Sequence, residues 1–349
     1  MERRIEETPA AIVVNGEIKK GIFASPFRNL NLNEAAPTGG FWRRMVWKTR
    51  LKEWLGFGIE HPDWYLSVFM QDAKYVGSGS FMAFDRRNKG LLTYECSGLS
   101  GTAKMATSFY GSESVCEKKN FKMKYFHNLD ESEHRIVIEA AGTRHKPSVS
   151  VDMRLSEDCG KLQPLLASIP LRGGCSIFTH KAPMPAAGRF RIGNEEFELD
   201  GSRDLAIMDE HKSYLPRKTV WRWATFAGYD ANGRLIGANL GDHDTIDEQA
   251  YWNENCLWIG DKMPLLGEVK FEFDRVKHTD PWKIKETNGR ADLTFYPDGD
   301  KVKNLHLGVM GMKYFQPCGR FRGYIVGDDG EQIEIDNMYG VAEMMDARW

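Results

Sequence analysis

Apolar and polar residues alternate along much of the chain, and turn dipeptides separate the alternating segments. A period of two is typical of antiparallel strands, because successive side chains point to opposite faces of a sheet. The clearest predicted hairpins are residues 53–72 about a His-Pro-Asp turn, 121–142, 221–241 about Asp230-Ala-Asn-Gly, and 322–337 about Asp328-Asp-Gly. Asn-Gly and Asp-Gly supply the positive φ angles that tight turns require. We therefore expect an all-β chain, with residues 41–55 fitting a helix and a strand almost equally well.

Two segments of the chain resemble each other. One begins at Gly188 and the other at Gly319, and both run Gly-Arg-Phe-Arg, a turn, Glu-x-x-x-(Leu or Ile)-Asp, and then Met-Asp about eight residues later. If this unit closes a domain twice, the chain divides into residues 1–212, with an N-terminal arm, and residues 213–349. Each part has enough strands to close a barrel, which removes exposed sheet edges.

Several longer runs resemble a known family, called domain of unknown function 2804. They are DEHKSYLPRKTVWRWATFAGYDANGRLIGANLGD (209–242), EQAYWNENCLWIGDKMPLLGEVKFEFD (248–274), GRADLTFYPDGD (289–300), FQPCGRFRGYIVGDDG (315–330) and EMMDARW (343–349). The resemblance covers nearly the whole chain, and the family name itself implies no activity.

A more distant resemblance concerns the group of carotenoid hydratases, AttH-like proteins and fungal Diels-Alderases. The residues that match its pattern are Gly188, Gly193, Phe197, Met208-Asp209 and Trp221-Arg-Trp223. This resemblance implies an all-β fold of two tandem lipocalin-like antiparallel β-barrels. Where the hydratases have Asp-His-x-Trp, this chain has Asp-Glu-His-Lys at 209–212, so the resemblance implies the fold rather than the chemistry.

Charge and cysteine usage exclude several classes of function. With 47 basic and 49 acidic residues and no long block of like charges, neither nucleic acid nor an anionic membrane is an expected partner. The six cysteines lie far apart without a C-x-x-C pair, which argues against a zinc knuckle and a dense disulfide scaffold. The first 21 residues lack the apolar core of a signal peptide, and no run of 18 apolar residues occurs. We expect a cytoplasmic protein without an integral membrane segment.

Asp209, Glu210 and His211 are the candidate catalytic residues. They are consecutive in one predicted strand, so Asp209 and His211 share a face and Glu210 lies on the other. A carboxyl group beside an imidazole in a partly desolvated barrel mouth can hold a proton near neutral pH and deliver it to an alkene or a carbonyl. The alternative is that Asp209 makes an interdomain hydrogen bond while His211 lies in solvent.

Five further residues are candidates for ligand binding. Trp221 and Trp223 share one strand face, where flat rings suit a polyene or ring system and can steady a developing cation. The alternative for this pair is core packing. Trp252 is a possible neighbour of the pair, Arg217 can bind a carboxylate or tie the linker to the barrel rim, and Asn253 can face a ligand or satisfy a loop.

These features favour a protein that binds a hydrophobic or amphipathic small molecule, such as an isoprenoid, a lipid or a polyketide-like compound. As an enzyme it is expected to be a cofactor-free lyase, hydratase, isomerase or cyclase using acid catalysis. A non-catalytic binder and a structural or interaction module are the alternatives. No metal site is expected, because the acids and the histidine of residues 242–247 lack a recognised ligand spacing. Neither the identity of the ligand nor the oligomeric state can be inferred from the sequence.

Overall fold

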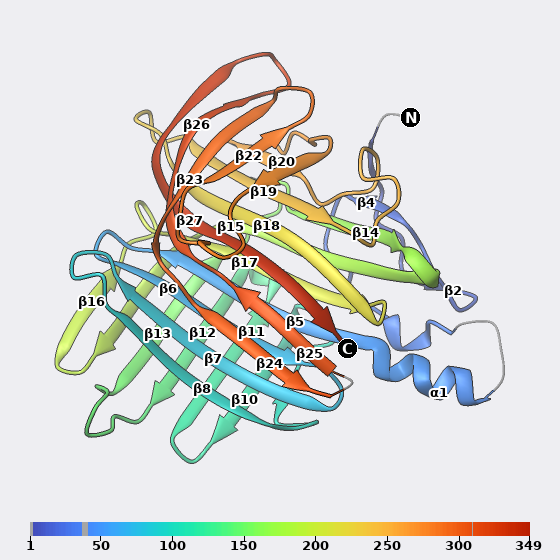
Figure 1. Ribbon diagram of the computed structural model, residues 1–349, viewed down its shortest axis with the longest axis horizontal. Coiled ribbons are helices and arrows are strands. Elements are labelled where there is room, and N and C mark those ends of the chain that lie inside the picture. Colours follow the sequence, from blue (N-terminus) through green and yellow to red (C-terminus); the bar gives the residue numbers. More distant parts are fainter. Residues whose placement is uncertain (1–2, 37–40, 309) are drawn as a thin grey trace.

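Two curled antiparallel sheets make up most of the molecule (Figure 1). The computed structural model describes residues 3–36, 41–308 and 310–349 and, apart from residues 41–44 and 307, their side chains. The predicted all-β class is confirmed, and each sheet forms a half-barrel. The helical elements of the described residues are α1 (Phe41–Arg50), η1 (Leu32–Glu34), η2 (Leu129–Glu131) and η3 (Arg172–Gly174).

The first sheet comes from the N-terminal part of the chain. Its strands follow the order β8-β7-β6-β5-β17-β15-β13-β12-β11-β10-β9, while β14 and β16 pair with β15, and β4 joins β14 to β1. The strands are β1 (Ile5–Glu6), β4 (Gly21–Phe23), β5 (Leu51–Glu60), β6 (Trp64–Asp72), β7 (Val76–Asp85), β8 (Leu91–Leu99), β9 (Ala103–Lys104), β10 (Tyr110–Lys118), β11 (Phe121–Asn128), β12 (Glu133–Ala140), β13 (Val149–Ser156), β14 (Leu165–Leu171), β15 (Cys175–Ile192), β16 (Glu195–Leu199) and β17 (Leu205–Tyr214).

The second sheet comes from the C-terminal part and follows the order β20-β19-β18-β27-β26-β23-β22-β21, with β25 joining β24 to β27. Its strands are β18 (Lys218–Tyr229), β19 (Leu235–His243), β20 (Cys256–Ile259), β21 (Val269–Glu272), β22 (Trp282–Glu286), β23 (Ala291–Gly299), β24 (Val302–Leu307), β25 (Met310–Phe315), β26 (Cys318–Val326) and β27 (Gln332–Arg348). A separate small hairpin consists of β2 (Val13–Val14) and β3 (Glu17–Ile18).

The four predicted hairpins are confirmed as β5–β6, β11–β12, β18–β19 and β26–β27. Residues 41–55, which fitted a helix and a strand almost equally well, contain both: the helix α1 ends at Arg50 and the strand β5 begins at Leu51. The two Gly-Arg-Phe-Arg segments lie in β15 and β26, each the first strand of a hairpin. The chain passes from one sheet to the other between Tyr214 and Lys218, close to the expected boundary, and the division into two independent domains stays a prediction.

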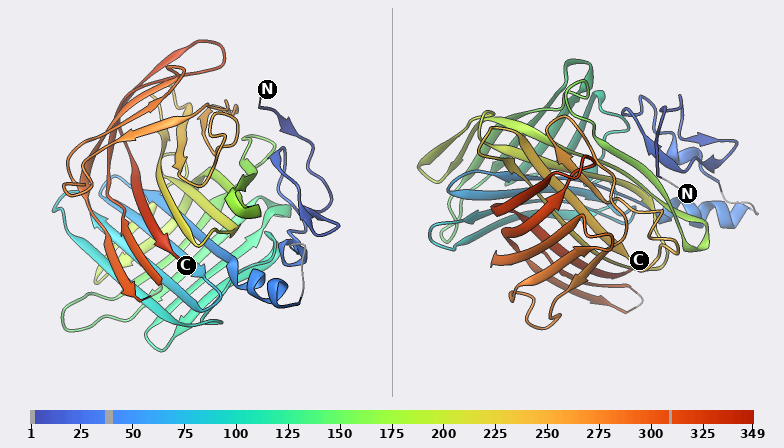
Figure 2. Two further views of the ribbon diagram at one scale, coloured as in Figure 1. Left: turned by 45° about the vertical axis from the view of Figure 1, so that its right-hand side comes forward. Right: turned by 90° about the horizontal axis from the view of Figure 1, so that it is seen from above.

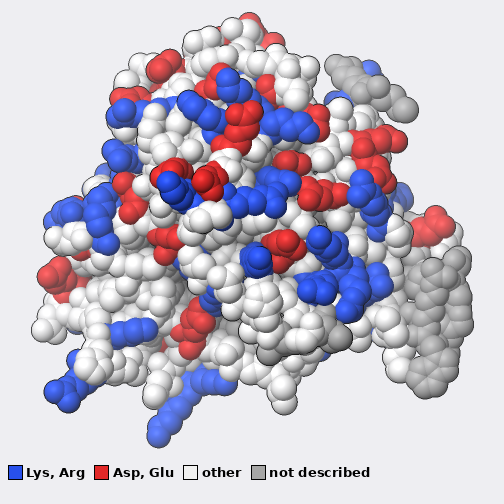
Figure 3. Space-filling model, viewed as in Figure 1, with Lys and Arg blue, Asp and Glu red and all other residues white. Residues whose placement is uncertain are grey.

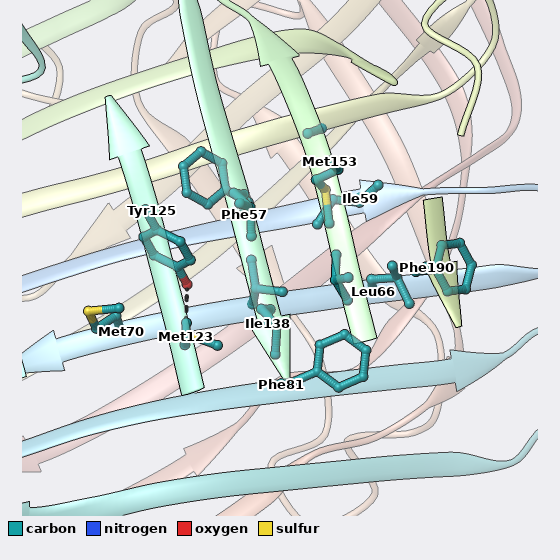
Figure 4. Packing of buried hydrophobic residues seen from close by; sticks show 14 of the residues in the cluster. Phe57, Ile59, Leu66, Met70, Phe81, Met123, Tyr125, Ile138, Met153 and Phe190 are labelled. Carbon is teal, nitrogen blue, oxygen red and sulfur yellow. Dashed lines mark hydrogen bonds between the residues drawn. The ribbon is translucent and has the colours of Figure 1, made fainter. Parts of the chain in front are cut away.

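Each sheet curls around a hydrophobic core of its own. In the first sheet, β5–β7 face β11–β13 across the core, and Figure 4 shows Phe57, Leu66 and Phe81 opposite Tyr125 and side chains of β12 and β13. The second core is built in the same way from β18–β27, and its large buried members include Phe226, Trp282, Phe295, Phe321 and Ile335. Burying this apolar area is the main favourable contribution to the stability of each half-barrel.

The faces that point away from the two cores meet in a seam between the sheets. In β5 the odd-numbered side chains enter the first core, and in β18 the even-numbered ones enter the second, so their alternate neighbours point into the seam. A mixed apolar cluster closes part of this seam with residues of both sheets: Tyr65, Met82, Phe84, Cys318, Tyr339 and Val341. Figure 2 shows the second sheet crossing the first, with the N-terminal segment along one side of the molecule.

Close approach of β18 and β27 requires a glycine at position 340. A Cβ atom there would lie 2.1 Å from the backbone oxygen of Thr225. We expect Gly340→Ala to lower the free energy of unfolding by about 1–3 kcal/mol, because the two strands must separate to admit the methyl group. The matched control is Gly228→Ala, since a Cβ at 228 would make an ordinary contact with Met338 at 3.7 Å. Urea unfolding followed by tryptophan fluorescence measures both, and equal midpoints would contradict the prediction.

Basic and acidic side chains are intermixed over the face shown in Figure 3. Many pair at short range, as Arg234 does with Asp230 and Glu331. Within the described ranges, no helix is long and apolar enough to cross a membrane.

Candidate functional site

The seam holds a cavity of about 1000 Å³, its open mouth included. Strands β5, β6, β7 and β17 of the first sheet and β18, β24, β25 and β27 of the second line it. No bulky side chain projects into the cavity from positions 56 and 58 of β5, because both are glycines that alternate with core-facing residues. A Cβ at position 58 would lie 2.2 Å from the hydroxyl oxygen of Tyr65, so this glycine makes room for the tyrosine.

Trp54 and Trp221, which line the cavity, are the middle members of a stack of four rings. His211, Trp54, Trp221 and His243 follow one another with centroid separations of 4.6, 5.9 and 5.9 Å and small interplanar angles. Trp223 lies beside the stack, and the ammonium group of Lys181 lies 4.7 Å from its ring centroid. Neighbouring rings therefore cover both faces of Trp54 and Trp221, and Lys181 covers one face of Trp223.

Asp209 lies at the centre of a buried charge cluster. Its carboxylate accepts hydrogen bonds from Lys181 Nζ at 2.6 Å and from Trp54 Nε1 at 3.3 Å, and His211 Nε2 lies 3.2 Å away. Burial opposes ionisation, but Lys181 and His211 outweigh it and hold the pKa of Asp209 well below its usual range. Asp209 is therefore an anion at neutral pH.

Glu254 completes the charge cluster from the second half of the chain. Its Oε2 lies 3.2 Å from Lys181 Nζ and 3.6 Å from His211 Nε2, while its Oε1 lies 3.6 Å from His243 Nε2. Burial opposes the ionisation of Glu254, but Lys181 and His211 outweigh it and lower the pKa of Glu254. Burial lowers the pKa of His243 to about 4, so this imidazole is neutral at pH 7. Among the described residues, the Nδ1 atoms of both histidines and Glu254 Oε1 have no hydrogen-bond partner, so the cluster retains unused polar capacity.

Glu343 of β27 is a second carboxyl group on the cavity wall. Trp221 Nε1 donates to its Oε1 at 2.7 Å, while the Tyr314 hydroxyl and the Gln316 amide donate to its Oε2 at 3.0 and 2.9 Å. Burial is the largest effect and raises the pKa of Glu343, and the nearby Asp209 anion raises it further, although the Trp221 indole acts in the opposite direction. Of the two carboxyl groups that line the cavity, Asp209 has a lowered pKa and Glu343 a raised one, so Glu343 is the better proton donor.

A family model described as "Domain of unknown function (DUF2804)" matches residues 2–349. The chain belongs to this family. No curated protein matches it. Among solved structures, the crystal structure of CghA is similar with a TM-score of 0.55 at 11% identity, over 85% of this chain and 88% of that chain. A protein described as an AttH from Nitrosomonas europaea gives a TM-score of 0.51 at 14% identity, over 84% of this chain and 92% of that chain.

A third similar structure is kievitone hydratase from Nectria haematococca, with a TM-score of 0.44, 12% identity and 92% of each chain covered. At these identities the CghA and AttH structures show that this DUF2804 chain shares their fold. The predicted resemblance to the DUF2804 family, and the more distant one to the group of AttH-like proteins and hydratases, are both confirmed.

The structure places Glu210 outside the cavity. Side chains alternate along β17, so Glu210 points to the other face, where His180 Nδ1 and Lys212 Nζ lie 3.8 and 3.6 Å from its carboxylate. Burial raises its pKa, and the two cations oppose that rise. It therefore cannot act together with Asp209 on one ligand in the cavity.

Three predicted ligand-binding residues of this DUF2804 chain also lie elsewhere. Arg217 is exposed and donates to the backbone oxygen of Trp349, which ties the linker to the C-terminus. Trp252 packs beside Tyr251. Asn253 holds its own loop, because its side chain donates to the Gln249 oxygen and accepts from the Asn255 N–H.

The sequence-based analysis missed Trp54, Lys181 and Glu343. Each had a weak local signal: Trp54 alternates with Gly56 and Gly58, and the other two are single charges inside apolar strand segments. His243 and Glu254 were considered only as parts of polar loops. Across the described ranges, no group of three or more His, Cys, Asp or Glu side chains is arranged to hold a metal ion.

Proposed function

We propose that the seam cavity of this DUF2804 protein binds an apolar or amphipathic small molecule and that Glu343 transfers a proton to it. One observation supports the proposal most directly: a buried carboxyl group with a raised pKa lines a largely apolar cavity, held by Trp221, Tyr314 and Gln316. A carboxyl group whose pKa is raised by burial is suited to general acid catalysis.

The proposed step is protonation of an unsaturated carbon. The Glu343 O–H bond breaks, a C–H bond forms, and positive charge develops on the neighbouring carbon of the ligand. The ionised Asp209 on the same cavity wall stabilises that charge. Water then adds to the cation, and its surplus proton returns to the Glu343 carboxylate, which gives a net hydration without a cofactor.

This division of roles differs from the sequence-based hypothesis, in which Asp209 or Glu210 donates the proton. Lys181 and His211 keep Asp209 ionised, and Glu210 faces the first core. Asp209 therefore serves as the electrostatic partner, and His211 helps to hold it in its anionic form.

Binding is tested with methyl cis-parinarate, an uncharged fluorescent polyene. Wild-type protein should bind it, and Ser67→Phe should weaken binding by about tenfold or more, because the half-buried Ser67 lines the cavity and a phenyl ring would fill it. The control is Ser97→Phe on the exposed face of β8, away from the cavity lining. Equal affinities of the two variants would show that the polyene binds elsewhere.

Proton transfer is tested on small molecules that co-purify with the protein. Native mass spectrometry identifies the adduct, and incubation in D₂O should introduce carbon-bound deuterium into the adduct on wild-type protein. Glu343→Gln should retain the adduct and lose the exchange, because the amide cannot supply a proton. If the adduct binds to both proteins and neither exchanges, the non-catalytic binder is the correct function; if wild-type protein binds neither an adduct nor the polyene, the proposal fails.

A further inference from the structure

Lys301 is a buried lysine on the cavity wall, and no carboxylate of the described residues pairs with it. Its side chain comes from the turn just before β24, the residue is 9% exposed, and its ammonium group donates to Ser80 Oγ at 3.5 Å. No described carboxylate lies within ion-pair distance of it. Lys303, two residues later, also lines the cavity but pairs with Glu95 at 2.5 Å.

The other buried lysines have strong acceptors. Lys181 contacts two carboxylates, and Lys52 donates to the backbone oxygens of Thr49 and Ala73. Lys212 donates to the backbone oxygen of Ala106 and lies 3.6 Å from the Glu210 carboxylate. Burying an ammonium group costs free energy unless an acceptor or a counter-ion replaces water. Lys301 is therefore the exception among the described buried lysines, since no described carboxylate pairs with it.

The surroundings of Lys301 form a polar corner. Ser78 and Ser80 are two residues apart in β7 and line the cavity, and Gln71 donates its amide to Ser78 Oγ at 3.0 Å. Both serine oxygens thus accept hydrogen bonds within the protein, which leaves both hydroxyl protons available to donate. One ammonium group and two hydroxyl donors match a singly charged oxyanion, whereas a phosphate carries more charge than this corner neutralises.

We propose that Lys301, with Ser78 and Ser80, binds the carboxylate of an amphipathic acid. The apolar body of this acid lies along the tryptophan side of the cavity, formed by Trp54, Trp221 and Trp223. This inference rests on the proposed function, since it assigns the ligand class of the same cavity. The polar corner at Lys301 and the tryptophan side line the same cavity, so a single ligand can contact both. Lys301 and Glu343 line the same cavity.

The test compares cis-parinaric acid with its methyl ester at pH 7. Wild-type protein should bind the acid at least tenfold more tightly, because a charge-assisted hydrogen bond forms only with the carboxylate. Lys301→Met should abolish this preference and leave the affinity for the ester unchanged. Lys303→Met is the matched control and should keep the preference, since Glu95 already neutralises Lys303.

A pH series on wild-type protein gives a second readout. Burial lowers the pKa of Lys301 to about 8, and the other charges acting on it are Lys303, Glu95 and Glu343. Affinity for the acid should therefore fall as the pH rises above 8, while affinity for the ester stays constant. A preference that survives Lys301→Met, or no preference in the wild type, overturns the inference and leaves the proposed function intact; failure of both probes to bind overturns both.

Discussion

Lys181→Met should lower the free energy of unfolding at pH 7 by about 3–5 kcal/mol, which is the usual cost of removing one partner from a buried ion pair. Lys181 is 1% exposed, and its ammonium group lies 2.6 Å from Asp209 and 3.2 Å from Glu254. Without it, two carboxylates remain in the seam, and the nearby His243 is neutral at pH 7 because burial lowers its pKa to about 4. Urea unfolding followed by circular dichroism measures the difference from wild type.

The pH dependence of this loss has a definite sign. Lys181 keeps the pKa values of Asp209 and Glu254 lowered in the folded protein, so their contribution to stability is present at neutral pH and disappears as the pH falls. The difference between Lys181→Met and wild type should therefore shrink as the pH falls below about 4, the unfolded pKa of these carboxyl groups. The triple variant with Asp209→Asn and Glu254→Gln added should recover much of the stability at pH 7. A loss below 1 kcal/mol, or one that grows in acid, would contradict the ion-pair interpretation.

Glu157→Gln is expected to have an effect of similar size, about 3–5 kcal/mol, inside the first half-barrel. Glu157 is buried and accepts from His134 Nε2 at 2.7 Å and from His180 Nε2 at 2.5 Å, while His127 Nδ1 lies 2.8 Å from His134 Nδ1. Burial works against the charged form of His180, but the Glu157 anion outweighs it and raises the pKa of His180. Replacing Glu157 removes the counter-ion of a buried imidazolium.

The stability loss in Glu157→Gln should grow as the pH falls, whereas the loss in Lys181→Met should shrink. A histidine whose pKa is raised by folding stabilises the fold below its unfolded value of about 6.5, and the contribution is lost as the pH rises through the raised value. The gap between wild type and Glu157→Gln should thus be largest near pH 5.5–6 and narrower at pH 8.5. The control Glu139→Gln changes a solvent-exposed carboxylate on β12 and should alter stability little. A gap that stays constant from pH 5.5 to 8.5 would rule out the His180 pair as its cause.

Local patterns predicted those parts of the site that depend on one strand. Because side chains alternate along a strand, the sequence placed Asp209 with His211 and Trp221 with Trp223 on shared faces, and the structure has both pairs on the seam. The same alternation separated Glu210 from Asp209. The consequence, that Glu210 enters a different network, needed the identity of the neighbouring strands.

Residues distant in the sequence decide the chemistry of the cavity. Trp221 bonds to Glu343, 122 positions away, and Lys181 joins Asp209 to Glu254 across the two sheets. No periodicity in a single sequence reports such pairs, since they depend on how far each sheet curls and on which faces then meet. Ionisation follows the same rule: the sequence identifies a carboxyl group, but its burial and its cationic neighbours determine whether it holds a proton.

The amino-acid sequence by itself determined the strands, the hairpin turns, the two interior faces and the family of this protein, because strand period and turn chemistry act over a few residues. Only the tertiary structure decided that the outward faces of two half-barrels enclose a cavity, that Glu343 and Lys301 lie on its wall, and that Asp209 is ionised. The physical reason is that solvent exclusion and Coulomb interactions act through space, between strands that the chain brings together only when both sheets have formed.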